Sequence, residues 1–545
     1  MKPRPTQFPV WLAVALTAFA LRLLYVWSVR DSPFFHNLQT NPERYDEWAT
    51  LILAGHAPAP PFEQAPGYAY FVAAIYALFG RGPEALAMVQ SLLDAATSIL
   101  IGRAAGRWFN SRSGWIAALL AASYGPLIYF SAELLPASVF VFLVSAAITL
   151  QLETFWIAAG CAWGFATLVR PEALFAFPIV VTSAGLGGGR RAALASALPI
   201  TLTVLLCVGV NSAAALKLAP VATSGGLNLW LGNNAHSDGV NPFVHGPLQQ
   251  VATRVVEDSH NDRVIADRLF RAVALQFWRE MPSSALSLTW KKLRWTFAAR
   301  ELPNTADISW QTSYSWLFAV PGLPLSFGLV LPLAFAGLPS LLRRRLSADA
   351  LLLTAWIVPG LTACVVFFTN ARFRLVMTPA LVILAAAAID HFADLLPKWR
   401  RRPGALVGCV FLAAIGAYLA WSDAYGIRQY RIPEIDVNTG ILEREAGHFP
   451  AAIEYLRRGL AAYPDDAIAW VHLALALEQN GQATDALQAY LEASRQLPDD
   501  RTVLPMAERF FERHQLDRGQ LQTFQRTTSP QLRDAIAKSL AQMVK

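Results

Sequence analysis

Two adjacent acidic residues, Asp46 and Glu47, offer the clearest chemistry in the sequence. They follow the first apolar run and directly precede another apolar helical stretch, so both carboxylates would lie at a membrane face. Adjacent helical residues point about 100° apart, so one carboxylate could face a cavity and abstract a proton while its neighbour binds a metal or fixes a helix end. The alternative is an acidic pair favoured by the dipole of a helix N-terminus.

Arginines at the predicted outer ends of helices form a second group of candidates. Arg372 and Arg374 occupy the turn that enters the apolar run at 374–396, and Arg170 precedes Pro171 at another such end. Guanidinium groups match phosphate oxygens with paired hydrogen bonds, so these side chains could bind a phosphate at headgroup depth. Arginines at helix ends also extend to lipid headgroups for purely structural reasons.

Polar residues between 214 and 316 have weaker claims. Asn233, Asn234 and His236 could bind a sugar or a metal, but Gly-Asn-Asn is also ordinary turn chemistry. Glu301 could bind substrate or simply be a polar group at a helix end. A further acidic and histidine cluster lacks a clean metal-ligand spacing, which favours a solvated face; its members are Glu257, Asp258, His260 and Asp262.

The composition indicates a membrane protein with a soluble tail. Of the 545 residues, 54% are hydrophobic and only 15% are charged, against about 25% charged in soluble proteins. The charge is densest after residue 430. The net charge of +7 fits Lys and Arg retained on the cytoplasmic side, so nucleic acid is not an expected partner. The four cysteines sit in apolar runs without paired spacing, which excludes a disulfide framework and a zinc site.

Eleven apolar runs predict an α-helical polytopic domain over residues 1–425, because a crossing needs about 20 apolar residues. The runs lie near 9–28, 85–102, 114–131, 134–150, 155–169, 172–187, 193–213, 317–341, 349–368, 374–396 and 404–421. If the first run leads outward, four basic joints fall inside, as the positive-inside rule requires. These joints are 103–112, 190–191, 343–345 and 398–402.

The same topology places two polar loops, 29–64 and 214–316, on the outer side. The apolar stretch 66–80 is short for a crossing, so we expect an interfacial or re-entrant helix there. Charges inside the runs, such as Arg22, Asp94 and Glu133, should point inward, since lipid exposure costs several kcal/mol. Arg22 could pair with Asp94 or meet a lipid phosphate. An odd number of crossings also places the C-terminal tail outside.

The tail repeats with a period of about 34 residues, the length of a tetratricopeptide unit. Matching positions include Gly447 and Gly481, Ala452 and Ala486, Pro464 and Pro498, and the acidic pairs 465–466 and 499–500. This predicts two repeats over 433–500, followed by a degenerate repeat or capping helices over 501–545. Such an all-α array predicts a protein partner.

Six short segments occur in an order typical of one enzyme family: YDEWA (45–49), YALFG (76–80), TLVRPEAL (167–174), SGGLNLWLGNN (224–234), ELPN (301–304) and TNARFRL (369–375). Over residues 8–400 the chain resembles the GT-C membrane glycosyltransferases, in the branch of the protein O-mannosyltransferases and aminoarabinose transferases. The resemblance implies a sugar donor carried on a polyprenyl phosphate.

The resemblance also implies roles for individual residues. Asp46 would be the base that deprotonates an acceptor hydroxyl, and Glu47 would support it or bind a divalent metal. Arg372, Arg374 and Arg170 would bind the donor phosphate. The chain departs from the family at Gln64, where relatives have Lys or Tyr before two prolines, so the donor contact must differ.

The sequence therefore predicts an inverting glycosyltransferase that acts outside the cytosol. The implied partners are a polyprenyl-phosphate sugar, a protein, lipid or glycan acceptor, and membrane lipids, and the implied location is a bacterial inner membrane with the tail in the periplasm. A transporter or flippase of lipid-linked saccharide is one alternative, although no duplicated halves support it. A tetratricopeptide scaffold for polysaccharide assembly is another, although an anchor needs one crossing rather than eleven.

Overall fold

The computed structural model describes residues 8–56, 58–244, 247–342, 348–398, 400–497, 503–527 and 529–544. The chain divides into two compact units. The first unit comprises Met1–Arg30, Thr40–Asn304 and Ile308–Gln429, and the second comprises Asp31–Gln39, Thr305–Asp307 and Tyr430–Lys545. Within the described ranges the secondary structure is helical, apart from one isolated bridge between Tyr124 and Leu325.

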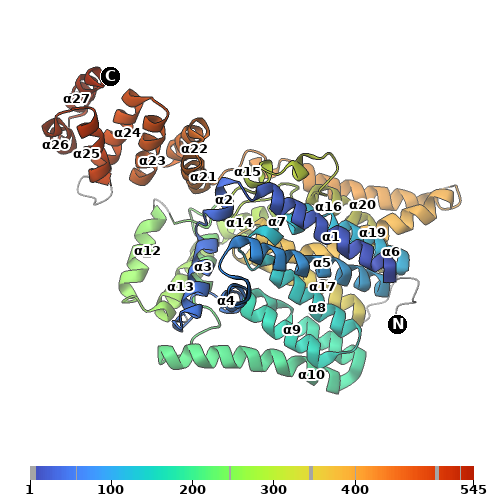
Figure 1. Cartoon of the computed structure of the whole chain (residues 1–545). Coiled ribbons are helices and arrows are strands. Elements are labelled where there is room, and N and C mark those ends of the chain that lie inside the picture. The colour runs from blue at the N-terminus through green and yellow to red at the C-terminus, as the bar shows by residue number, and fades with distance from the viewer. Residues whose placement is uncertain are drawn as a thin grey trace. The chain divides into compact units, whose positions relative to one another are not determined.

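The first unit is a bundle of helices of very different lengths (Figure 1). Its α-helices are α1 (Phe8–Val29), α3 (Asn41–Leu53), α4 (Gly67–Phe79), α5 (Pro83–Trp108), α6 (Ser111–Ala122), α7 (Gly125–Ala132), α8 (Ala137–Leu152), α9 (Trp156–Val169), α10 (Phe177–Ala215), α11 (Gly225–Gly232), α12 (Pro247–Asp258), α13 (Arg263–Glu280), α14 (Pro282–Thr296), α15 (Ile308–Ser313), α16 (Phe327–Leu342), α17 (Ala348–Val366), α18 (Ala371–Arg374), α19 (Thr378–Leu395) and α20 (Pro403–Trp421). Its 3-10 turns are η2 (Pro171–Ala176), η3 (Trp316–Ala319), η4 (Leu375–Met377), η5 (Leu396–Lys398) and η6 (Ala424–Gly426).

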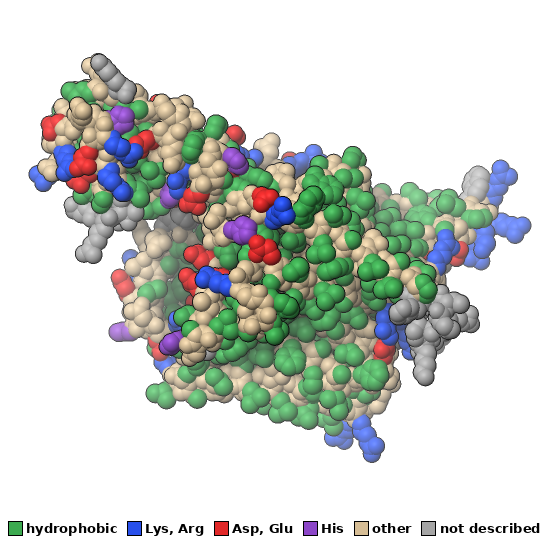
Figure 2. All heavy atoms as spheres, viewed as in Figure 1, with side chains coloured by type: hydrophobic (Ala, Val, Ile, Leu, Met, Phe, Trp, Pro, Cys, Tyr) green, Lys and Arg blue, Asp and Glu red, His purple; other side chains and the backbone are tan. Residues whose placement is uncertain are grey.

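The length and apolar character of these helices confirm a polytopic membrane protein. In the described part of the chain, five helical segments are long and apolar enough to cross a membrane: Pro9–Val29, Pro83–Trp108, Pro171–Ala215, Ala371–Lys398 and Pro403–Trp421. The bent pair α7 and α8 makes a sixth if it is one crossing. Shorter apolar helices include α4, α9 and parts of α16 and α17. Figure 2 shows hydrophobic side chains over much of the visible face of the first unit, and the exposed large hydrophobic residues include Leu12 and Leu16 of α1 and Ile157 and Phe165 of α9, as a lipid-facing surface requires.

All eleven predicted runs contain helix, but they do not form eleven separate helices. The run 114–131 divides into α6 and α7, since Pro126 cannot continue a helix and the backbone here bonds to Leu325 instead, with Gly125 N donating to Leu325 O at 2.8 Å. The runs 172–187 and 193–213 both lie within α10, which consists of two helices that meet at Gly189, where φ is +74° and the backbone is not helical. That left-handed conformation favours glycine.

The predicted inward orientation of Arg22 is realised as a buried ion pair. Arg22 of α1 and Asp94 of α5 are both fully buried, with 2.5 Å between Nε and Oδ2. Arg22 Nη1 also donates to the carbonyls of Ala18 and Ala122, at 2.8 and 2.7 Å. The pair therefore fastens α1, α5 and the end of α6 together, and this is the structural alternative of the two that the sequence left open.

Three of the four basic joints, 103–112, 190–191 and 398–402, lie towards one end of the first unit, and the fourth, 343–345, lies outside the described residues. Arg112 at the start of α6 approaches Asp390 and Asp394 near the end of α19, at 3.3 and 3.7 Å. The bend of α10 and the start of α20 lie towards this same end (Figure 1). This arrangement fits the predicted inner side.

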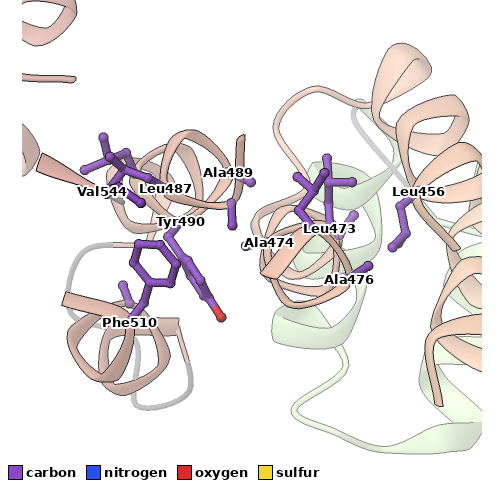
Figure 3. Packing of buried hydrophobic residues seen from close by; sticks show 14 of the residues in the cluster. Leu456, Leu473, Ala474, Ala476, Leu487, Ala489, Tyr490, Phe510 and Val544 are labelled. Carbon is purple, nitrogen blue, oxygen red and sulfur yellow. The ribbon is translucent and has the colours of Figure 1, made fainter. Parts of the chain in front are cut away.

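The second unit is a stack of short helices. They are α21 (Pro433–Glu445), α22 (Phe449–Ala462), α23 (Ala467–Gln479), α24 (Ala483–Gln496), α25 (Val503–Arg513), α26 (Arg518–Arg526) and α27 (Pro530–Met543). Figure 3 shows the core between them, in which Tyr490 and Phe510 lie 5.0 Å apart between ring centroids. The turns after α21 and α23 contain Gly447 and Gly481, with φ of +82° and +77°, which explains why the repeat places glycine at both positions.

Two segments from elsewhere in the chain complete the second unit. One is Asp31–Gln39, which contains α2 (Pro33–His36) and buries Phe34 and Phe35. The other is Thr305–Asp307, and Asp307 lies close enough to Asp436 and Tyr455 to act on their ionisation. The tail therefore packs with residues from both loops that the sequence predicts on the outer side.

Candidate active site

Helix α3 presents Asp46 inward and Glu47 outward. The helix begins after Thr40, has Pro42 in its first turn, and packs beside α4 (Figure 1). Asp46 is 7% exposed, whereas Glu47 lies on the exposed side of the helix. The two carboxylates diverge as adjacent helical residues must. The structure thus separates a buried acid from a solvated one.

The Asp46 carboxylate is held by two side chains that follow it in the sequence. Tyr76 of α4 donates its hydroxyl to Oδ1 at 2.6 Å. Arg81, in the turn between α4 and α5, donates from Nη2 to Oδ2 at 2.5 Å and from Nε to Oδ1 at 3.3 Å. Burial, and then the hydrogen bond to Asp46, raise the pKa of Tyr76, so this hydroxyl stays a donor at neutral pH. The hydrogen bond to Asp46 likewise raises the pKa of Arg81.

Two of the predicted arginines, Arg170 and Arg372, lie close to each other. Arg170 pairs with Glu172 and lies over the Phe373 ring, 4.7 Å from its centroid. Its Nη1 approaches the carbonyl of Arg372 at 3.5 Å. The Nε of Arg372 is buried without a hydrogen-bond partner.

Tyr45 connects this arginine pair to the acidic residue beside it. Burial raises the pKa of Tyr45, while the positive charges of Arg372 and Arg170 act in the opposite direction. Both cations are therefore near the residue that directly precedes Asp46. Tyr45 also contacts Tyr68 of α4 edge-on, with 4.9 Å between ring centroids. The charges of Arg170 and Arg372 therefore act on Tyr45, whereas the hydrogen-bond partners of the Asp46 carboxylate are Tyr76 and Arg81.

Arg374 occupies a different environment from Arg372. It is 3% exposed, and it donates to the carbonyls of Thr296, Ala298 and Arg300 at 3.2, 2.5 and 3.3 Å. Its guanidinium also pairs with Glu301 at 2.6 Å. Positions two apart on a helix point about 200° apart, so α18 directs these two arginines to opposite sides. The predicted phosphate ligands therefore divide into one beside α3 and one engaged with residues 296–301.

Asn233 and Asn234 bond to the chain itself. The Asn233 amide donates to the carbonyls of Leu229 and Val366 at 2.8 and 2.7 Å, and its Oδ1 accepts from Trp278 at 3.2 Å. Asn234 Oδ1 accepts from the backbone N–H of His236 at 2.8 Å, which is the turn chemistry that the sequence also allowed. Glu301, the third predicted substrate ligand, is the partner of Arg374.

Sequence reasoning missed Lys292 of α14, which is fully buried. Its Nζ donates to the carbonyls of Gly232 and Phe367, each at 3.0 Å, and to Asn233 Oδ1 at 3.3 Å. Burial lowers the pKa of Lys292 to about 7. This lysine joins the end of α11 to the segment that leads into α18. In the sequence, Lys292 is the second of two adjacent lysines after Trp290, and this pattern does not indicate such a role.

Arg81 and Tyr76 were also missed as partners of Asp46. They lie in and just after YALFG, but the sequence does not show that the turn after α4 returns to α3. No three His, Cys, Asp or Glu side chains in the described ranges lie close enough to hold a metal ion. The acidic and histidine cluster has an ordinary structural role in part, because Asp262 caps α13 and pairs with Lys217.

Comparison with known proteins agrees with the resemblance that the sequence indicated. Residues 63–214 match the dolichyl-phosphate-mannose-protein mannosyltransferase family. Residues 437–501 match a tetratricopeptide repeat family, which confirms the predicted repeats. No curated protein sequence matches the chain.

Solved structures similar to the chain include two that were determined with a lipid phosphate bound. The oligosaccharyltransferase AglB from Archaeoglobus fulgidus, in complex with an inhibitory peptide and a dolichol-phosphate, is 14% identical with a TM-score of 0.40 and covers 81% of this chain. This chain spans 58% of that protein. ArnT from Cupriavidus metallidurans, bound to undecaprenyl phosphate, is 14% identical with a TM-score of 0.36, and the match covers 97% of this chain and 89% of that one.

Proposed function

We propose that the chain is an inverting glycosyltransferase that moves a sugar from a polyprenyl-phosphate donor to an acceptor hydroxyl. The observation that carries this proposal is the buried Asp46 carboxylate on α3, with Arg170 and Arg372 near the adjacent Tyr45. The match of residues 63–214 to a mannosyltransferase family supports it. A base beside a cationic site is the pairing that transfer from a sugar phosphate requires.

In the proposed reaction Asp46 takes the proton of the acceptor hydroxyl. The acceptor oxygen then forms a bond to the anomeric carbon, and the bond from that carbon to the phosphate oxygen breaks. The electron pair of the broken bond stays with the departing polyprenyl phosphate. Attack opposite the leaving group inverts the anomeric carbon. Arg372, with an unpartnered buried Nε, is the first choice to stabilise the phosphate, and Arg170 is the second.

The other predicted site residues support this centre in our proposal. Arg374, Glu301, Asn233 and Asn234 direct polar atoms at the chain itself, so we assign them to fixing the outward loops rather than to touching substrate. Glu47 is exposed, which suits a supporting role near the acceptor. Because the described residues do not provide a metal-ligand group, we assign no step to a divalent metal.

We further propose that transfer occurs on the outer side of a bacterial inner membrane, with the tail on the same side. The supporting observation is that the tail shares one compact unit with Asp31–Gln39 and Thr305–Asp307, which belong to the two loops predicted outside. The α3 segment lies in the first of those loops. The repeats would then face the same side of the membrane as a protein partner or a protein acceptor.

The proposal is tested by changing Asp46→Asn in cells and profiling cell-surface glycans. We expect one modification to disappear while the protein remains at normal abundance. Glu43→Gln is the matched control, because Glu43 is an exposed acid on the same helix and its change removes the same charge. A glycan profile that Asp46→Asn leaves unaltered would contradict catalysis by this carboxylate and favour transport or scaffolding.

A further inference from the structure

The two side chains of the ion pair between Arg81 and Asp46 differ strongly in their exposed fraction. The Asp46 side chain is 10% exposed, whereas that of Arg81 is 62% exposed. The buried partner is the proposed base, and the exposed partner covers it from solvent. Together with the Tyr76 hydroxyl, Arg81 supplies three hydrogen bonds to the two carboxylate oxygens. A base with these lone pairs occupied is poorly placed to receive an acceptor proton.

The backbone around Arg81 allows this side chain to be repositioned. Arg81 stands between Gly80, which ends α4, and Gly82, which precedes α5. Gly80 has φ of +86°, and a Cβ placed there would meet no atom within 4 Å. Glycines on both sides give the turn wide conformational freedom, and Gly80 is exposed.

The proposed reaction places a phosphate within reach of this turn. Reacting atoms approach to about 3–3.5 Å, so the acceptor oxygen, the anomeric carbon and the leaving phosphate form one short row that begins at Asp46. A guanidinium binds phosphate oxygens through the same paired hydrogen bonds that it offers a carboxylate. A donor phosphate and the Asp46 carboxylate therefore compete for one cation.

We propose that Arg81 is a phosphate-binding residue of the donor site, and that it covers Asp46 until the phosphate of a bound donor draws it away. This inference rests on the proposed function and adds a coupling between donor binding and exposure of the base. It makes the carboxylate available for an acceptor only when a sugar phosphate is in place. Such an order protects the base from unproductive encounters in the empty enzyme.

The inference predicts a specific pattern of binding affinities for a lipid phosphate. Undecaprenyl phosphate is titrated into the full chain in nanodiscs of phosphatidylcholine, so that the donor analogue is the anionic lipid added. Arg81→Gln should weaken binding about tenfold or more, because a charge-assisted hydrogen bond is lost. Asp46→Asn should tighten binding, by about threefold to tenfold on the same grounds, because the competing charge on Arg81 is removed. In the double variant this tightening should disappear.

Arg103→Gln is the control, since Arg103 lies near the other end of α5 and also forms an ion pair, in this case with the more exposed Glu153. It should bind undecaprenyl phosphate like the unchanged chain. Size-exclusion profiles of all variants show whether each is folded. If the positive charge of Arg81 is what binds the phosphate, Arg81→Lys should retain part of the affinity for undecaprenyl phosphate that Arg81→Gln loses.

The outcomes separate this inference from the proposed function. If the unchanged chain binds undecaprenyl phosphate but Arg81→Gln binds it equally well, Arg81 is not a donor ligand, and the proposed function stands without it. If the unchanged chain does not bind the lipid phosphate, both ideas fail. If nanodiscs containing phosphatidylglycerol abolish the difference between the unchanged chain and Arg81→Gln, Arg81 serves general lipid headgroups, which also overturns the inference.

Discussion

The two arginines of the TNARFRL segment provide a sharp prediction, because they differ in environment while sharing one turn of helix. Arg374→Gln removes a guanidinium that is 3% exposed and that serves three carbonyls and the Glu301 carboxylate. Removing one partner of a buried ion pair costs about 3–5 kcal/mol. Since native proteins are stable by about 5–15 kcal/mol, this change should greatly reduce the amount of folded protein.

Arg372→Gln should behave differently. Its Nε is buried without a hydrogen-bond partner, so removing it leaves no partner atom unsatisfied, and the free energy of unfolding should change by no more than about 1 kcal/mol. The folded protein should instead lose affinity for undecaprenyl phosphate. The difference in stability between the two variants should then be at least about 2 kcal/mol.

The assay measures folding and binding separately for each variant. Size-exclusion chromatography of fluorescent fusions gives the folded yield, and unfolding in mixed micelles gives the relative stability. Replacing Arg374 and Glu301 together by apolar residues should restore part of the folded yield, because no unpaired charge remains. The reasoning is refuted if Arg374→Gln folds as well as Arg372→Gln, or if Arg372→Gln binds the lipid phosphate normally.

Two further predictions concern Lys292 and Gly459. The pKa of Lys292 in the folded chain is about 7, below the usual value near 10.4, so the unfolded chain binds more protons between these pH values. The free energy of unfolding should therefore rise with pH in this window, by up to about 1.4 kcal/mol per pH unit. Unfolding measured at pH 7 and pH 9 should show this rise in the unchanged chain but not in Lys292→Met, and an equal rise in both would contradict the prediction. In the tail, a Cβ at Gly459 would lie 2.4 Å from Val437 Cγ2, so Gly459→Ala should destabilise the packing of α21 on α22 by about 1–3 kcal/mol. The variant should therefore show faster proteolysis of the tail in the full chain. An unchanged cleavage rate would show that the two helices move apart at little cost in free energy.

The sequence predicted the architecture well wherever a pattern reports on local physics. Apolar runs identified the membrane helices, because lipid contact demands a continuous apolar surface. The 34-residue period identified the repeats, and the glycines at 447 and 481 have the left-handed backbone that a tight turn needs. The division of the run 114–131 into α6 and α7 at Tyr124 was not predicted, because it depends on a backbone contact with Leu325, some 200 residues further along the chain.

The candidate site was less accessible to sequence reasoning, because its contacts join distant segments. The divergence of Asp46 and Glu47 followed from helix geometry alone. The different fates of Arg372 and Arg374 required knowing which neighbours each side of α18 meets. Arg81 and Lys292 could not be identified as site residues from the sequence, because the position of a single basic residue in a turn or helix does not show which residue it will pair with in the fold.

The most direct test of the central claim is sugar transfer by the purified chain in nanodiscs, with a polyprenyl-phosphate sugar and an acceptor identified from the glycan profile. We expect Asp46→Asn to reduce the transfer rate by at least about a hundredfold, within the range of general base catalysis, while donor binding is retained. Transfer by Asp46→Asn at the rate of the unchanged chain would contradict the central claim.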